Sequence, residues 1–347
     1  MKSFSCACGA PLFFHNTWCL NCNNPVGYDS VSDAMVRLTK GAPWKLCANG
    51  STHQVCNWVI PGNLEGLCLA CQVNRTIPDL SLPQNLGLWR KMESAKRRTV
   101  YWLLRRGLTV RSKTVAPDTG LAVDFLRPQN GQPVLTGHDH GVITFNLEEA
   151  DDSLRENNRN VLSEPYRTLL GHFRHEMAHY YWWLWFEKGA APPTWIQTVR
   201  QVFGDDRRDY ITALRTYYQT GAPADWSATH ISAYAATHPW EDWAESWAHY
   251  THITDALETA RCCQLVCKAA NVPWRLKPDD VRLPPPFEKE KGATFLEIIH
   301  QWMALAPALN EMSLSLGHAD LYPFSPTPAV VKKLHLIHAM LSAPNKK

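Results

Sequence analysis

The chain has 347 residues, of which 45% are hydrophobic and 19% are charged. This composition supplies enough apolar material for a sizeable core and carries too little charge for a disordered chain. With 35 Lys and Arg against 32 Asp and Glu, the net charge of +3 excludes a chain built as a whole to bind a polyanion.

The cysteines are the first unusual feature. There are 11, an odd number, so complete internal disulfide pairing is impossible, and eight of them lie in the first 71 residues. The first ten residues contain no apolar run of the kind found in secretory signals, and no stretch approaches the roughly 18 apolar residues of a membrane span. We therefore expect a cytoplasmic protein without a membrane segment, in which clustered cysteines indicate metal binding.

The first eight cysteines form two groups of four: the first is built on two closely spaced pairs, and the second on one close pair and two cysteines spaced more loosely. The groups are Cys6, Cys8, Cys19 and Cys22, and then Cys47, Cys56, Cys68 and Cys71. Two close pairs on tight turns complete a tetrahedral sulfur site that leaves no open position, which is typical of structural zinc. We predict a zinc-ribbon module over 1–80 with two structural zinc ions. His15 or His53 could replace one ligand. The remaining Cys262, Cys263 and Cys267 are predicted to be buried core thiols.

A basic helix is expected next. Residues 73–85 hold two prolines and indicate a linker, and the apolar spacing from Leu86 to Leu104 is helical. We assign 81–115 as a basic helical linker with only Glu93 as an acid; its basic residues are Arg90, Lys91, Lys96, Arg97, Arg98, Arg105, Arg106, Arg111 and Lys113. Such a stretch is typical of a solvated helix face that docks on an acidic neighbour, and a nucleic-acid surface is the alternative.

The rest of the chain, 116–347, is expected to form the main domain. Residues 119–147 are rich in β-branched residues with Pro and Gly between them, which predicts a small sheet. Helical patterns follow, with Ser163 as an N-cap before a helix that ends near Gly189; the others cover 195–220, 239–268, 292–304 and 328–342. The predicted fold class is α+β, with a mostly helical domain behind the cysteine module.

The helix from 164 carries the sequence His175-Glu176-Met177-Ala178-His179, an HExxH motif. Residues i and i+4 lie above one another on a helix, so both imidazoles can reach one metal ion. The intervening Glu176 lies beside the metal, where it can take a proton from zinc-bound water. Ionisable groups on a helix with so many aromatic neighbours would be costly without a function.

A catalytic zinc site needs a third protein ligand. The best region is 237–250, where Thr237 is a candidate cap, Pro239 fits the first turn, and Glu241, Glu245 and His249 share one helix face. We predict Glu241 as the ligand and Glu245 as the carboxylate that hydrogen-bonds to a ligand histidine; the reverse assignment remains open. His249 is a weaker candidate, and a solvated helix start is the alternative for the two acids.

Two segments are specific enough to reveal a family resemblance, EPYRTLLGHFRHEMAHYYW at 164–182 and HPWEDWAESWAHYTHITDALETA at 238–260. Shorter matches support them: CACGAPLFF, CNWVIP, NRTIPDLSLPQN, AKRRTVYWLL, GVITFNLEEADDSLRE and DLYPF. The chain resembles the bacterial zinc-binding metallopeptidases that carry an N-terminal zinc ribbon. The resemblance covers most of the chain and implies a zincin-like catalytic domain behind rubredoxin-like zinc knuckles.

The catalytic region is also similar to glutamate-type zincins. In some of these, a tyrosine about two turns ahead of the ligand glutamate donates a hydrogen bond to the developing oxyanion. Tyr234 lies seven residues before Glu241 and fits that offset, with His230 and His238 as rivals and a packed core tyrosine as the alternative.

The expected function is therefore zinc-dependent hydrolysis of a peptide or protein substrate, with one catalytic and two structural zinc ions. The zinc ribbon is a candidate surface for a protein partner. The alternative from another class is a zinc-ribbon adaptor that binds nucleic acid or protein and carries a vestigial zincin domain. The intact HExxH motif argues against this alternative, because a degenerate site would be free to lose Glu176.

Overall fold

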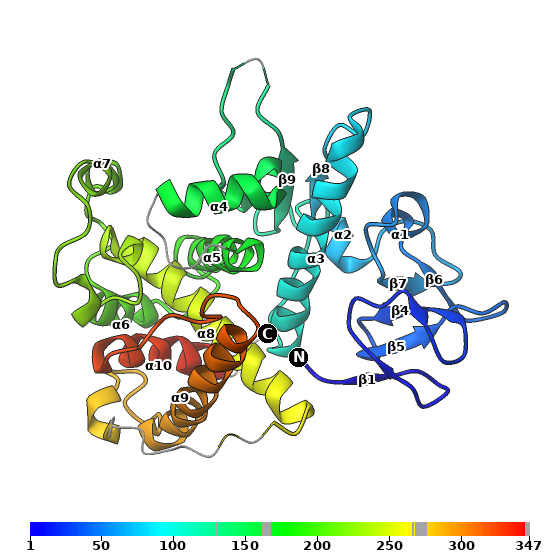
Figure 1. The fold of residues 1–347 in the computed structure, drawn as a ribbon. Helices are drawn as coiled ribbons and strands as arrows, with labels where there is room; N and C mark the ends of the chain where they lie inside the picture. Colours follow the sequence, from blue (N-terminus) through cyan, green and yellow to red (C-terminus); the bar gives the residue numbers. More distant parts are fainter. Residues whose placement is uncertain (130, 162–167, 266, 268–275, 344–347) are drawn as a thin grey trace. The chain divides into compact units, whose positions relative to one another are not determined.

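A computed structural model describes residues 1–129, 131–161, 168–265, 267 and 276–343 of the chain (Figure 1). The chain divides into two compact units, Met1–Phe173 and Arg174–Lys347. Within the described residues, no helix combines the length and apolarity that crossing a membrane requires.

The first unit begins with a module of short strands and two short helices. Strands β3, β4 and β5 form one antiparallel sheet, while β1 pairs with β2 and β6 pairs with β7. The elements are β1 (Phe4–Ser5), β2 (Pro11–Leu12), β3 (Trp18–Cys19), β4 (Asn24–Asp29), β5 (Ala34–Arg37), β6 (Trp44–Leu46), α1 (Ala48–His53), β7 (Val59–Pro61) and α2 (Leu69–Gln72).

Tight turns and a small aromatic core shape this module. Gly9 has φ +87° in the turn after Cys8, a conformation that a side chain would strain. Gly50 packs so closely on the following loop that a Cβ would lie 2.4 Å from the Cys56 carbonyl oxygen. The rings of Phe14, Tyr28 and Trp58 lie 4.9–6.3 Å apart, centroid to centroid. This core is small, so metal binding is a physically reasonable source of additional stability.

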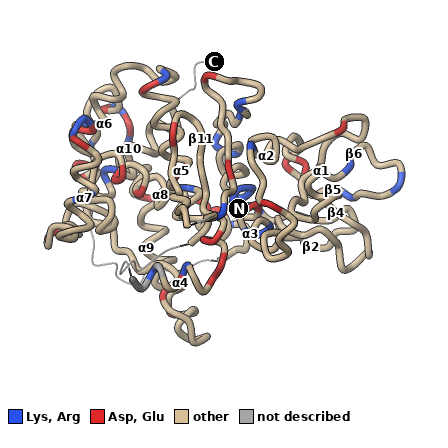
Figure 2. The backbone as a smooth tube through the Cα atoms, turned by 90° about the horizontal axis from the view of Figure 1, so that it is seen from above, with Lys and Arg blue, Asp and Glu red and all other residues tan. Residues whose placement is uncertain are grey.

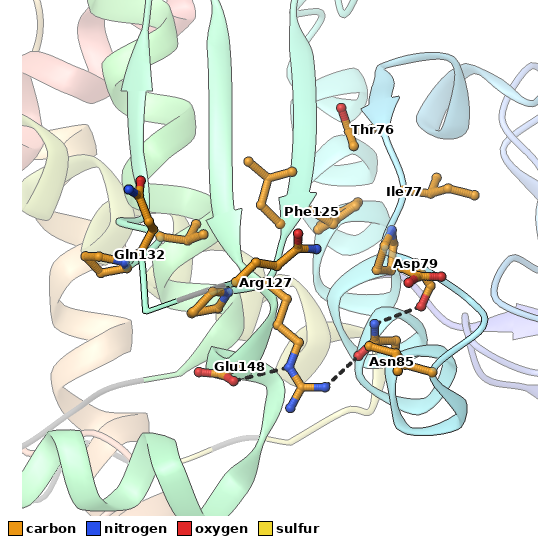
Figure 3. A pocket seen from close by; sticks show the side chains of 15 residues that line it. Thr76, Ile77, Asp79, Asn85, Phe125, Arg127, Gln132 and Glu148 are labelled. Carbon is orange, nitrogen blue, oxygen red and sulfur yellow. Dashed lines mark hydrogen bonds and ion pairs between the residues drawn. The ribbon is translucent and has the colours of Figure 1, made fainter.

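The same unit contains a four-stranded sheet in the order β10-β11-β9-β8. Strands β8, β9 and β11 are parallel, and β10 is antiparallel to β11. An open pocket lies where the parallel strands end (Figure 3). The elements of this part are β8 (Asn74–Thr76), α3 (Pro83–Arg105), β9 (Ala122–Leu126), β10 (Gly137–Asp139), β11 (Val142–Asn146), η1 (Leu147–Ala150) and α4 (Asp152–Val161).

Helix α3 carries much of the basic stretch, and several of its charges are used inside the unit. Lys96 is fully buried and pairs with buried Glu93 at 2.8 Å, and Arg97 donates to the Val55 carbonyl. Arg90 donates to the Gln54 carbonyl and Lys91 pairs with Asp152. Figure 2 shows basic and acidic positions interleaved along the backbone. The expectation of a solvated basic helix face is therefore wrong for Lys96 and Arg97, because both side chains enter the protein interior.

The second unit is helical. Helix α5 begins in the first unit, where the Phe173 ring stacks on Phe145 with centroids 3.9 Å apart, and its remainder belongs to the second unit. The elements are α5 (Leu169–Trp182), the π-helical turn η2 (Trp183–Glu187), α6 (Thr194–Phe203), α7 (Tyr210–Thr220), η3 (Trp226–Ala228), η4 (Tyr234–Ala236), α8 (Pro239–Cys262), η5 (Pro278–Val281), α9 (Gly292–Ser315) and α10 (Pro328–Ser342).

Aromatic side chains form the core of this unit around α8. Trp243 is fully buried, and its ring centroid lies 5.6 Å from those of Trp182 and Trp247 and 6.2 Å from that of Trp185. Trp243 Nε1 also donates to the Ala178 carbonyl at 3.1 Å, which joins α8 directly to the HExxH turn of α5. The packing fixes these two helices against each other next to the candidate site.

The predicted α+β class is confirmed: a module of knuckles and short strands precedes a mostly helical part with a small sheet. The expected helix at 195–220 is two helices, separated at Gly204. The N-cap of α8 is His238, whose Nδ1 accepts from the Trp240 amide, so the assignment of Thr237 as cap is wrong. The proposed N-cap Ser163 lies outside the described residues, and the domain boundaries at 80 and 115 stay a prediction.

Candidate metal centres

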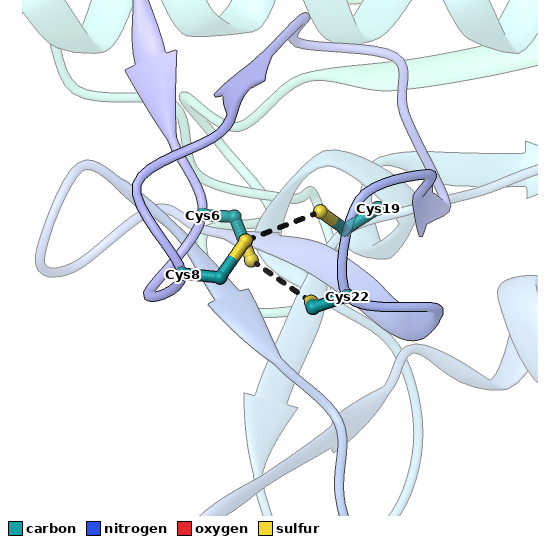
Figure 4. A group of neighbouring side chains, drawn as sticks. All are labelled: Cys6, Cys8, Cys19 and Cys22. Carbon is teal, nitrogen blue, oxygen red and sulfur yellow. Dashed lines mark hydrogen bonds between the residues drawn. The ribbon is translucent and has the colours of Figure 1, made fainter.

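The first cysteine group converges on one point (Figure 4). The Cys6 and Cys22 sulfurs lie 3.6 Å apart, the Cys8 and Cys19 sulfurs 3.7 Å apart, and all four fall within 4.8 Å of one another. Tetrahedral zinc with bonds of about 2.3 Å separates its sulfur ligands by about 3.8 Å. The Asn21 amide donates to Cys8 Sγ at 3.5 Å and lowers the pKa of this thiol to about 6, which favours the thiolate. The geometry therefore fits a zinc ion.

The second group has the same geometry and is completely buried. The Cys56 and Cys68 sulfurs lie 3.7 Å apart, and the sulfurs of Cys47, Cys56, Cys68 and Cys71 all lie within 4.8 Å of one another. Backbone amides point at two of them: Cys68 N–H donates to Cys47 Sγ at 3.2 Å, and Trp58 N–H donates to Cys56 Sγ at 3.4 Å. Four buried sulfurs with amide donors are the environment of a tetrathiolate metal site rather than of a disulfide.

The HExxH histidines meet Glu241 in the second unit. His175 Nε2 lies 3.0 Å from His179 Nε2 and 3.0 Å from Glu241 Oε2, and His179 Nε2 lies 3.5 Å from the same carboxylate oxygen. Zinc bonds of about 2.0–2.1 Å place tetrahedral ligand atoms about 3.3 Å apart. All three residues are buried, and Glu241 Oε2 has no hydrogen-bond partner among the described residues. The three atoms are therefore arranged as metal ligands would be.

Glu245 contacts the far side of the His175 ring. Its Oε1 lies 2.8 Å from His175 Nδ1, and its Oε2 accepts a hydrogen bond from Ser232 Oγ at 2.7 Å. A carboxylate on Nδ1 fixes the ring orientation and directs Nε2 toward the cluster. Burial lowers the pKa of His175, but its contacts with Glu241 and Glu245 outweigh burial and raise the pKa well above its ordinary value.

Two aromatic side chains contact the cluster, and sequence reasoning missed one of them, Tyr210. Tyr210, the first residue of α7, donates its hydroxyl to Glu241 Oε1 at 2.7 Å, which leaves Oε2 directed at the histidines. The Trp240 ring lies 3.7 Å from the His179 ring, centroid to centroid. Tyr210 lies 31 residues before Glu241, so no local spacing could have indicated this contact.

The two predicted catalytic residues lie beside this cluster. Glu176 is 7% exposed on α5, between the two histidines in sequence. Tyr234 stands on η4, with its ring centroid 6.1 Å from that of His175. Burial raises the pKa of Tyr234 well above its ordinary value, and the charges of Glu241 and Glu176 raise it further, so its hydroxyl stays a donor. The arrangement combines a buried carboxylate and a phenol donor with the three-residue cluster.

Several weaker candidates lie elsewhere. His249 is not in the cluster: its Nδ1 lies 2.7 Å from the Tyr322 hydroxyl, and burial lowers its pKa to about 4. The two cysteine groups are complete without His15 or His53. The expectation of buried core thiols near the end of α8 is wrong: Cys263 is exposed, and Cys262 and Cys267 are half-buried.

Two protein-family models match the chain. The sequence model of the family described as "Putative zinc-binding metallo-peptidase" matches residues 85–340, which is more than half of the chain. The chain belongs to this family. A zinc-ribbon domain model matches residues 3–82, the part that holds both cysteine groups. Zinc is thus the metal that both family descriptions and the sulfur geometry support.

Three relatives of this metallo-peptidase family member align with nearly the whole length of the chain. Proteins of Mycobacterium bovis and of two Mycobacterium tuberculosis strains are each 38% identical to it over 343 residues, which are 98% of this chain and 95% of each relative. All three carry the name "Uncharacterized protein" with a locus label. No solved structure matches the chain significantly.

Proposed function

We propose that the protein is a zinc-dependent peptidase that cleaves peptide bonds at the cluster in its second unit. The observation that carries the proposal is the convergence of His175 Nε2, His179 Nε2 and Glu241 Oε2, with the buried Glu176 on the same helix turn as the histidines. Three protein ligands leave one coordination position open, which distinguishes catalytic from structural zinc. The substrate is a peptide or an unfolded protein segment.

His175, His179 and Glu241 would hold the zinc ion, which would act as a Lewis acid and lower the pKa of a bound water to about 7. Glu176 then accepts the proton of the attacking water and delivers it to the leaving amine. The Tyr234 hydroxyl donates a hydrogen bond to the developing oxyanion. Glu245 and Ser232 hold His175, and Tyr210 holds Glu241, so that these ligands keep one orientation.

The two cysteine groups are proposed to hold one structural zinc ion each, which gives three zinc ions per chain. They have four sulfur ligands and therefore no open position for a reacting group. The zinc ribbon remains a proposed surface for a protein partner, and the cytoplasmic location remains a proposal. A nucleic-acid partner is less well supported, because Lys96 and Arg97 are buried.

The test of the proposal is the zinc content of His175→Ala. We expect zinc to fall from three to two ions per chain and hydrolysis of a reduced, alkylated protein substrate to disappear, because one ligand of the open site is lost. His318→Ala, at an exposed position, is the matched control and should keep three ions and full activity. Unchanged zinc content in His175→Ala, measured by elemental analysis of the folded protein, would reject the site.

The two carboxylates near His175 should respond differently to substitution. Glu241→Gln removes a ligand charge and is expected to lose the catalytic zinc. Glu245→Gln keeps the ligands and loses the charged contact with His175 Nδ1, so zinc affinity should fall by about 10- to 100-fold. Competition with a zinc chelator measures both affinities. The reverse order of the two losses would show that Glu245 is the ligand.

A further inference from the structure

The pocket in the first unit shares no lining residue with any of the three candidate metal centres. It is open, has a volume of about 1060 Å³, and lies at the carboxyl ends of β8, β9 and β11. Small-molecule and peptide sites commonly have volumes of about 300–1,000 Å³. In open sheets of parallel strands, ligands bind in the crevice outside the carboxyl ends. Position and size therefore both indicate a binding site.

The sheet is interrupted beside this pocket. Phe125 and Leu126 of β9 are in register with Phe145 and Asn146 of β11, but the register of β8 with β9 stops at Thr76 and Asp124. The chain continues from Thr76 into Ile77 and Pro78, and proline has no N–H with which to extend the ladder. The end of β9 thus faces the pocket on the side where β8 has turned away. Phe125 is fully buried and Leu126 is half-buried, so an added strand could continue the pairing only from the last residue of β9 onward.

Several polar groups of the pocket are hydrogen-bonded to one another. Arg127 Nε donates to Glu148 Oε1 at 3.2 Å and its Nη1 donates to Asn85 Oδ1 at 3.1 Å, while Asn85 Nδ2 donates to the Asp79 carbonyl at 2.8 Å (Figure 3). The lining holds one positive charge, Arg127, against two negative charges, Asp79 and Glu148. The arginine is already neutralised, so an anionic ligand such as a phosphate would find no unbalanced cation.

The walls are apolar and accessible. Ile77 is 41% exposed and Leu82 is 39% exposed, and three prolines line the pocket with them: Pro78, Pro128 and Pro133. The side-chain amides of Gln129 and Gln132 add groups that both donate and accept hydrogen bonds. Apolar walls with balanced donors and acceptors suit a peptide, whose backbone offers one donor and one acceptor per residue.

We propose that this pocket binds an extended, uncharged peptide segment of another protein. The segment pairs along the end of β9 and places a large aliphatic or aromatic side chain against Ile77 and Leu82. This site is independent of the proposed zinc chemistry, since all of its residues lie in the first unit.

The test uses the full-length Glu176→Gln protein, so that bound peptides are not cleaved. The probe is an array of overlapping ten-residue peptides from a casein, and the strongest uncharged binder is then titrated by fluorescence anisotropy. We expect Ile77→Glu to weaken its binding at least tenfold by placing a charge on the apolar wall. Val115→Glu, at an exposed position of the same unit that does not line the pocket, is the matched control and should bind normally.

A second variant, Gln132→Trp, fills the pocket from an exposed position and should weaken binding equally. It keeps the test decisive if Ile77→Glu does not fold. Binding should persist in His175→Ala, because the pocket does not need the catalytic zinc. The proposal is overturned if both pocket variants bind normally, if only acidic peptides bind, or if His175→Ala abolishes binding. A protein that fails to hydrolyse peptides but shows pocket-dependent binding would reject the proposed function alone.

Discussion

Glu176→Gln is expected to lower peptide hydrolysis by about 10²- to 10⁴-fold while the protein keeps all its zinc. Glutamine has nearly the same shape as glutamate but cannot accept the water proton at neutral pH. The Glu176 side chain is buried on α5 but provides none of the three ligand atoms. The cluster of His175, His179 and Glu241 should therefore be unchanged. The measurement is the initial rate of cleavage of an alkylated protein substrate, with zinc content determined on the same sample.

The control for this variant is Glu311→Gln, which makes the same chemical change at an exposed position of α9. It should cleave at the rate of the unsubstituted protein. A Glu176→Gln protein that keeps both its zinc and its activity would show that another group takes the proton. Loss of zinc along with activity would instead show that Glu176 supports the ligands rather than the reaction.

Cys68→Ser is expected to release one zinc ion and to unfold the ribbon module. Cys68 provides one of four buried sulfurs, and its amide also donates to Cys47 Sγ. Structural zinc contributes an apparent free energy of about 10–16 kcal/mol in small metal-folded modules, far more than a small core can replace. Trypsin should then cleave the first 80 residues rapidly, and elemental analysis should give two zinc ions per chain.

Cys263→Ser is the matched control, because the same change is made at an exposed thiol outside both cysteine groups. It should retain three zinc ions and the resistance of the ribbon to trypsin. If Cys68→Ser instead retained its full zinc content and its protease resistance, the second group would not be a structural metal site.

The sequence predicted the parts of this arrangement that depend on local spacing. His175 and His179 are one helical turn apart, and three of the cysteine pairs have only one or two residues between their members, so short-range geometry brings these pairs together. Tyr210 and Ser232 depend on tertiary packing, which places them on Glu241 and Glu245 from 31 and 13 residues away. No periodic pattern carries that information.

Helix α3 shows the same limit of prediction from sequence, because its contacts also depend on tertiary packing. Its composition is visible in the sequence, but the direction of each side chain depends on what packs around α3. The buried Glu93 accepts hydrogen bonds from Lys96, Trp89 and Asn74, and these contacts turn one face of the helix toward the interior. Burial of a lysine becomes possible only because its carboxylate partner is buried with it.

That internal face has a consequence for the charge of the second cysteine group. Four thiolates around one Zn²⁺ carry a total charge of −2, and Glu93, with Oε2 at 3.9 Å from Cys71 Sγ, adds another negative charge. Contacts with the other three cysteine sulfurs have the largest effects on the pKa of Cys71, and the charge of Lys96 lowers it as well; Arg97 lies 3.8 Å from Glu93. Lys96 and Arg97 together exceed Glu93 by one positive charge, so helix α3 would offset part of the negative charge of the proposed zinc site.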